Sequence, residues 1–106
     1  MRTVKSKHFS EILQKNDMYR MAEFFKVLGN PTRIHILLLL MERDTCVSEL
    51  ADRLCYTQSA VSHQLNILKS NKLIRQRREG KMIFYTITNQ NVKLAIEKGM
   101  EYILQK

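Results

Sequence analysis

Two short helical stretches separated by a tight turn restrict the fold of this chain more than any other feature of its sequence. The first runs from about residue 48 to residue 54 and carries Leu50 and Leu54 on one face. The apolar residues of the second, at helical spacing, are Val61, Leu65 and Leu68. Because Cys55-Tyr56 between them leaves room only for a turn, the sequence predicts a helix-turn-helix over residues 48–70.

From Leu73 onward the apolar period changes from helical to alternating, which is typical of extended strands. Side chains alternate in character along residues 74–78 and again along residues 82–87. Glu79-Gly80 between these runs suits a tight turn. The sequence therefore predicts a two-stranded hairpin over about residues 73–87, and no other strand is expected.

Helices are also predicted on both sides of these elements. Residues 8–28 have helical spacing with a break at Asn16-Asp17, where one of the two would cap the second part. Asn30 as a cap and Pro31 as the first helical residue mark the start of another helix. In the helix-turn-helix, Ser48 is the expected cap of the first helix, and Thr57 or Ser59 that of the second. A last helix is expected over about residues 89–105, capped by Asn89 or Asn91.

A chain of 106 residues has room for one domain. We expect residues 1–106 to form a single winged helix-turn-helix, mainly α with a β-hairpin wing, that begins with an N-terminal arm or helix over residues 1–15. The apolar faces of the first and last helices have no obvious partner inside so thin a domain, which predicts an α-helical dimer interface. The residues predicted in this interface are Phe9, Ile12, Leu13, Val92, Ile96 and Ile103.

The charge of the chain predicts a polyanionic partner. Eighteen Lys and Arg residues against ten Asp and Glu residues leave a formal charge of +8. A membrane surface is disfavoured, because the basic residues gather in the hairpin and not on one helix face. The start of the chain does not resemble a signal peptide, and the longest apolar run, residues 36–41, is too short to cross a bilayer. We therefore expect a cytoplasmic protein whose two cysteines stay reduced.

The second helix of the predicted pair has the composition of a DNA reader. Its early turns carry small or amide side chains that suit the major groove, and these candidates are Thr57, Gln58, Ser59, Ser62, His63 and Gln64. The hairpin adds basic side chains that suit phosphates or the minor groove, namely Arg75, Arg77, Arg78 and Lys81. Each set alone would suit a solvated surface, but together with the helix order and the positive charge they predict double-stranded DNA as the partner.

Over about residues 20–105 the sequence resembles the ArsR/SmtB family of bacterial repressors. The resemblance is carried, in matching order and spacing, by FFKVLGNPTR at 24–33, CVSELA at 46–51, SAVSHQL at 59–65 and GKMIFY at 80–85. It implies a homodimer, joined through its first and last helices, that represses an operon from a palindromic operator until an inducer releases it. It also implies that residues 59–65 read the major groove and that residues 77–81 form the wing.

The metal sites of this family lead to two expectations about the inducer. Many members bind zinc on the last helix, where the matching positions here are not good zinc ligands: Asn89, Asn91, Tyr102 and Gln105. Cys46 with Glu49 does match the ligand pair of a related zinc or cadmium site, which the resemblance completes from the other subunit's N-terminal arm. The candidate donor in that arm is His8, with Glu11 and Asp17 as alternatives. The alternatives are a zinc or cadmium site at Cys46, Glu49 and this donor, or a Cys46 that is only a small packed residue.

Other functions stay open beside the metal-responsive repressor. Cys55 lies close to a helix N-terminus and to basic residues, which favours thiol oxidation there. A redox-responsive or inducer-independent repressor is therefore an alternative, and a winged-helix module for protein contact is a more distant one. An enzyme is not expected, because the sequence contains no nucleophile–base set, phosphate loop or pair of catalytic carboxylates.

Overall fold

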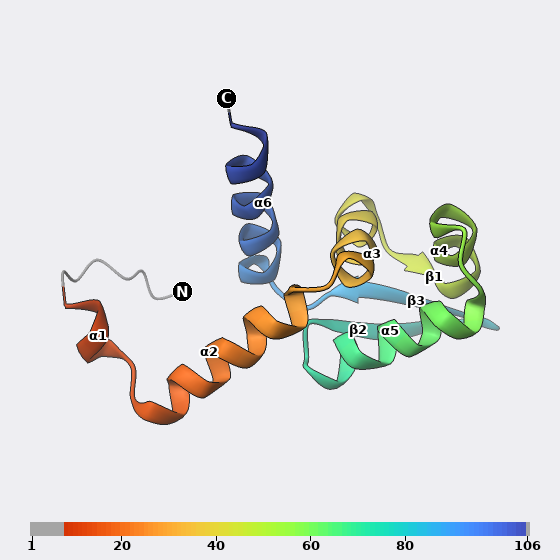
Figure 1. The fold of residues 1–106 in the computed structure, drawn as a ribbon. Helices are drawn as coiled ribbons and strands as arrows, with labels where there is room; N and C mark the ends of the chain where they lie inside the picture. Colours follow the sequence, from red (N-terminus) through yellow and green to blue (C-terminus); the bar gives the residue numbers. More distant parts are fainter. Residues whose placement is uncertain (1–7, 106) are drawn as a thin grey trace.

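The computed structural model describes residues 8–105, and the predicted arm at residues 1–7 lies outside the described residues. Its helices are α1 (Phe9–Ile12), α2 (Lys15–Leu28), α3 (Pro31–Glu42), α4 (Val47–Leu54), α5 (Gln58–Ser70) and α6 (Gln90–Leu104). Its strands are β1 (Thr45–Cys46), β2 (Ile74–Glu79) and β3 (Met82–Ile87). In Figure 1, α3, α4 and α5 gather beside the sheet, while α1 and the beginning of α2 extend away from it. The predicted fold class, mainly helical with a hairpin wing, is confirmed.

The sheet is antiparallel, with the strand order β1-β3-β2. Strands β2 and β3 form the predicted hairpin, and Gly80 in its turn has a φ of 60°, in the left-handed region that favours glycine. Strand β1 was not expected: Thr45 pairs with Tyr85, and Cys46 pairs with Phe84. Two residues are too few to show an alternating pattern, so only the folded chain reveals this strand.

The core forms between α3, the two helices of the helix-turn-helix and one face of the sheet. Ile36 and Leu37 of α3 are completely buried. The other main core residues are Leu50, Val61, Leu65 and Leu68 from α4 and α5, and Ile74, Tyr85 and Ile87 from the sheet. Because alternate residues of a strand face opposite sides, burial of Ile74 and Tyr85 directs Arg75, Phe84 and Thr86 to the outer face of the sheet.

Three predicted helix starts are confirmed by their caps. The side chains of Asn30, Thr57 and Asn89 each accept a hydrogen bond from a backbone N–H three residues further on. These bonds satisfy donors that the first turn of a helix leaves without a partner. The cap of α5 matters most for function, because it holds the beginning of the helix that carries the predicted DNA contacts.

Two predicted helix starts were wrong. The first two helices separate at Leu13 and Gln14 and not at Asn16-Asp17. Asp17 instead lies in the first turn of α2, where its carboxylate accepts a hydrogen bond from the backbone N–H of Gln14 at 3.2 Å. Helix α4 has Cys46 at its cap position and not Ser48, because pairing of Cys46 with β3 brings the chain into the helix earlier.

The residues predicted in the dimer interface fall into two groups. Val92 and Ile96 are buried within the single chain and belong to its core, and Ile96 also lines the apolar groove beside α6. They lie on the part of α6 that packs on α3 and β3. The others reach the surface: Phe9, Ile12 and Ile103 are exposed, and Leu13 is half-buried. The last turns of α6 pass beyond the core, which leaves their apolar side chains uncovered in the chain alone.

Among the described residues, no single helix is long and apolar enough to cross a membrane. Helices α2 and α3 meet that criterion only when they are taken together, and they are bent by 86° relative to each other. The bend falls at the predicted boundary of Asn30 and Pro31.

Candidate nucleic-acid interface

The outward face of α5 is polar along its whole length. Gln58, Ser59 and His63 are exposed, and Ser62 is half-buried. Thr57 precedes them as the cap, and its Oγ1 accepts a hydrogen bond from the backbone N–H of Ala60 at 3.0 Å. The opposite face holds the buried Val61, Leu65 and Leu68. The structure therefore brings five of the six predicted helix contacts together at the beginning of one helix.

Gln64 is the sixth predicted helix contact, and the structure places it elsewhere. Its Oε1 accepts a hydrogen bond from Nε of Arg33 at 3.0 Å, and Nη1 of Arg33 donates to the carbonyl of Val27 at 3.1 Å. Gln64 thus braces α5 against the junction of α2 and α3, so its amide oxygen is engaged within the protein, and its contact with DNA stays a prediction. Sequence reasoning missed this role of Arg33, because the contact joins residues 31 positions apart.

Asn66 is a second residue that sequence reasoning missed. It is exposed, and it follows Ser62 by four positions and Ser59 by seven, so it extends the polar face of α5 by one turn. Helical spacing would have predicted it, because residues four and seven apart share one face of a helix. The exposed face is therefore longer than the first two turns of α5.

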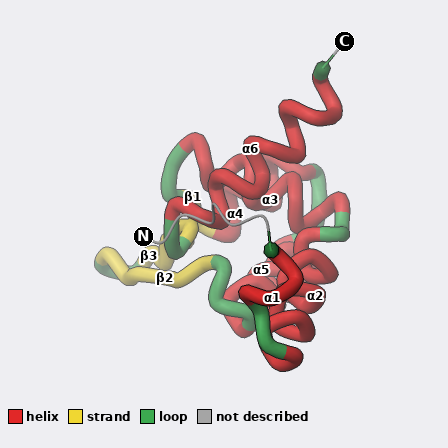
Figure 2. Tube along the Cα trace, turned by 90° about the vertical axis from the view of Figure 1, so that its left-hand side faces the viewer, coloured by secondary structure: helices red, strands yellow, loops and turns green. Residues whose placement is uncertain are grey.

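The hairpin lies beside α5 and projects from the helices (Figure 2). Nζ of Lys69 in α5 donates a hydrogen bond to Oε1 of Gln76 in β2 at 3.2 Å, which joins the two predicted DNA-contacting elements. Arg75, Arg78 and Lys81 are exposed, and none of them takes part in an ion pair with any other residue between 8 and 105. Their charges are available to an anion outside the chain.

Arg77 differs from the other predicted wing contacts. Its guanidinium forms ion pairs with Asp44 at 3.2 Å and with Glu79 at 2.8 Å, and it lies 5.0 Å from the centre of the Phe84 ring. The hydrogen bond to Glu79 and then that to Asp44 raise the pKa of Arg77 above its ordinary value. A cation held by two carboxylates is less available to phosphate than Arg75, Arg78 and Lys81 are, and the DNA contact of Arg77 stays a prediction.

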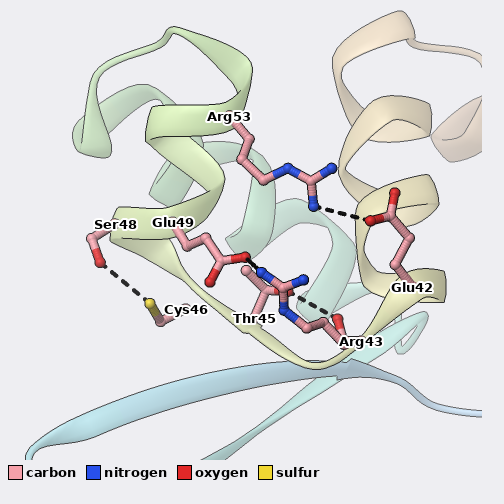
Figure 3. A network of polar contacts seen from close by, with 7 residues as sticks. All are labelled: Glu42, Arg43, Thr45, Cys46, Ser48, Glu49 and Arg53. Atoms are coloured by element: carbon pink, nitrogen blue, oxygen red, sulfur yellow. Dashed lines mark hydrogen bonds and ion pairs between the residues drawn. The ribbon is translucent and has the colours of Figure 1, made fainter.

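Cys46 lies at the N-terminus of α4, within a network of polar contacts (Figure 3). Its Sγ is 3.2 Å from Oγ of Ser48. The hydrogen bond from Ser48, followed by one from the backbone N–H of Glu49, lowers the pKa of the Cys46 thiol. Both bonds stabilise the thiolate, which is the form that binds metal ions and attacks electrophiles.

The other two predicted metal ligands do not join Cys46 within the chain. The carboxylate of Glu49 forms an ion pair with Arg43, and His8 directly precedes α1. Between residues 8 and 105, no three His, Cys, Asp or Glu side chains are placed to hold a metal ion together. At this position the described part of the chain supplies a thiolate and a carboxylate that is paired with Arg43, which is fewer donors than the four that zinc takes.

Cys55, the predicted redox residue, is exposed at the other end of α4. Its backbone is in the left-handed region, with a φ of 59°. A helix rises about 1.5 Å per residue, so the eight residues of α4 separate the two cysteines by roughly 12 Å. A disulfide needs Cα atoms less than about 7 Å apart, so the two cysteines cannot be bridged without a change in the backbone.

Comparison with known proteins identifies the family. Residues 30–76 match the family model described as bacterial regulatory protein, arsR family. The transcriptional repressor SmtB homolog of Synechocystis sp. is 37% identical over 82 residues, which cover 77% of this chain and 62% of that protein. The cadmium resistance transcriptional regulatory protein CadC homolog of Staphylococcus aureus is 32% identical over 88 residues, which cover 82% of this chain and 73% of that protein. The chain belongs to the arsR family.

A solved structure extends the similarity to nearly the whole arsR-family chain. The antimony-specific transcriptional repressor AntR superposes with a TM-score of 0.81 at 30% identity, covering 97% of this chain and 95% of that one. The match covers far more of the chain than residues 30–76 of the family model. The predicted resemblance to the ArsR/SmtB family is confirmed.

The low pKa of Cys46 leads to a test of its cause. Replacing Ser48→Ala removes the hydrogen bond that stabilises the thiolate, so the pKa of Cys46 should rise and less thiolate should be present at pH 7. Since one pKa unit is a factor of ten in that fraction, we expect alkylation by iodoacetamide to slow about two- to fivefold. Mass spectrometry of a Cys55→Ser background would follow Cys46 alone.

The matched control is Ser70→Ala, which removes a serine hydroxyl from the end of α5, where it donates to the carbonyl of Asn66. It should leave the alkylation rate of Cys46 unchanged. A Ser48→Ala protein that reacts as fast as this control would contradict the role given to Ser48.

Proposed function

We propose that this protein is a sequence-specific DNA-binding transcriptional repressor, which acts in the cytoplasm as a homodimer on a palindromic operator. One observation carries the proposal: the polar outward face of α5 lies beside a wing on which three exposed cations, Arg75, Arg78 and Lys81, have no acidic partner among the described residues. Membership of the arsR family and similarity to two proteins named as repressors support it. The protein-contact module is the competing function.

The geometry divides the DNA contacts between two elements. The first turns of α5 would enter the major groove, where Gln58 can pair with an adenine edge and Ser59, Ser62 and His63 can donate to bases or phosphates. Arg78 and Lys81 at the end of the wing would contact phosphates or the minor groove. The formal charge of +8 favours this approach over long distances.

The DNA contacts make a prediction about salt dependence. A duplex selected by the protein from a random-sequence pool should bind more weakly as salt rises. Lys81→Gln should reduce the magnitude of the slope of log K against log salt by about 1.8, because one phosphate contact is lost in each of the two subunits. Gln58→Ala should change the selected sequence and leave the slope unchanged. Fluorescence anisotropy over a range of salt concentrations measures both.

Lys98→Gln is the control for charge, because Lys98 lies on α6 and pairs with Glu101. It should leave the slope unchanged. If the wild-type protein selects no duplex at any salt concentration, the DNA-binding function is wrong and the protein-contact module is favoured.

The exposed apolar side chains support the homodimer. A groove of about 520 Å³ lies between α2, α3 and α6, lined by Phe25, Leu28, Ile34, Met100 and Ile103 among others. Helix α1 presents its own exposed Phe9 and Ile12. We propose that a second copy of the chain covers these surfaces, because exposed apolar groups at both ends of one chain become buried when two copies pack symmetrically.

Replacing Ile103→Asp should therefore produce a monomer, because the dimer would have to bury an unpaired carboxylate. Ile103 is 75% exposed in the single chain, so the fold of each subunit should survive. Asn91→Asp adds the same charge at an exposed position on the same helix and should stay dimeric. Sedimentation velocity distinguishes the two states, and an Ile103→Asp protein that is still dimeric would exclude this interface.

For the inducer, we propose a soft divalent metal ion such as zinc or cadmium, bound by Cys46 and Glu49 and completed by the partner chain, with His8 as a candidate donor. The lowered pKa of Cys46 supports this site, because a metal binds the thiolate. The names of the CadC homolog and of AntR refer to cadmium and to antimony. Binding would require Glu49 to leave Arg43.

Cadmium titration of the reduced protein tests this inducer. Formation of a thiolate–cadmium bond should raise ultraviolet absorbance, release the selected duplex and be lost in Cys46→Ser, whereas Cys55→Ser should behave as the wild type. Release by peroxide without any response to cadmium, abolished by Cys55→Ser, would instead favour the redox-responsive repressor.

A further inference from the structure

Arg77 lies at the row where the wing leaves the three-stranded part of the sheet. In the strand register, Phe84 of β3 is opposite Cys46 of β1 on one side and opposite Arg77 of β2 on the other. This is the last row with three strands. The two rows beyond it, which pair Arg78 with Ile83 and Glu79 with Met82, have only two.

The guanidinium of Arg77 reaches across this row to the chain that leads into β1. Its Nε and Nη2 donate to Oδ2 of Asp44 at 3.3 and 3.2 Å, and Asp44 directly precedes β1. On the way the guanidinium lies over the ring of Phe84, and its Nη1 pairs with Glu79 beside the hairpin turn. One side chain therefore joins both outer strands and the central strand.

Support at this row matters because an isolated two-stranded hairpin is marginally stable in water. The end of the wing carries Arg78 and Lys81, the cations that the proposed function assigns to DNA. Without a connection to the third strand, these cations would sample many positions, and ordering them on DNA would cost binding free energy. A side chain such as that of Arg77, which ties the hairpin to the third strand at this row, reduces the free-energy cost of ordering these cations on DNA.

We propose that Arg77 is a positioning residue, which clamps the wing to Asp44 so that Arg78 and Lys81 are held ready for DNA, and that Arg77 itself contacts no phosphate. This inference rests on the proposed function, because it concerns how the wing meets DNA. It assigns to Asp44, an acidic residue, a positive contribution to the binding of a polyanion.

The sign of the Asp44→Asn effect distinguishes the two roles of Arg77. If Arg77 positions the wing, Asp44→Asn and Arg77→Gln should each weaken binding of the selected duplex, by about three- to tenfold for the loss of one exposed ion-pair network. The double variant should be no weaker than either single variant, because both remove the same clamp. The slope of log K against log salt should stay at the wild-type value in all three.

A phosphate contact by Arg77 would give the opposite pattern and overturn the proposal. Arg77→Gln would then reduce the magnitude of the salt slope by about 1.8, one contact for each subunit of the dimer, and Asp44→Asn would tighten binding, because it removes a carboxylate that competes with DNA for the guanidinium. Arg78→Gln serves as the positive control for the slope, since Arg78 is exposed and has no ion pair among the described residues.

Hydrogen exchange of the DNA-free dimer tests the clamp independently of DNA. Exchange of the backbone amides at the end of the wing should quicken in Arg77→Gln and in Asp44→Asn, while the amides of α3 keep wild-type rates. Unchanged exchange in both variants would refute the clamp. If the wild-type protein selects no duplex but the wing amides respond, the proposed function is wrong while the clamp is upheld.

Discussion

Burial of Val61, Leu65 and Leu68 against the rest of the core sets the rotation of α5 about its own axis. Each of these side chains is completely buried, and burial of one such side chain contributes roughly 1.5–3 kcal/mol. Only one rotation of the helix buries all three, so Gln58, Ser59, Ser62, His63 and Asn66 face outward. The orientation of the proposed DNA-reading surface is thus a consequence of hydrophobic packing on the opposite side of the same helix.

Polar contacts then connect this helix to its neighbours. Gln64 is joined through Arg33 to the end of α2, and Lys69 is joined to Gln76 of the wing. The contacts of Arg33 are partly buried and that of Lys69 is exposed, so each contributes only about 1 kcal/mol or less to the free energy of unfolding. Their effect is geometric, because they connect α5 to the helix that leads into the exposed apolar surfaces and to the strand that carries the cations.

Cys46 is placed where several of these elements meet. It is part of β1, it is opposite the wing residue Phe84, and it caps the first helix of the helix-turn-helix. A ligand or a modification at this thiol would therefore act on the wing and on the helix pair together. This position, together with the stabilised thiolate, explains why Cys46 is a better candidate than Cys55 for a regulatory residue, although the sequence drew attention to both.

The sequence by itself determined the order of the elements, the helix-turn-helix, the hairpin and most of the caps, because these depend on local periodicity and on side chains within a few residues. It also determined most of the exposed face of α5. Only the tertiary structure decided that Gln64 and Arg77 are held by Arg33 and Asp44, that β1 exists, and that Val92 and Ile96 belong to the core. Each of these depends on residues about 30 or more positions apart in the chain or on the packing of a whole helix. Local composition cannot show whether a polar side chain already has a partner, because that partner comes from a distant segment which only folding brings near.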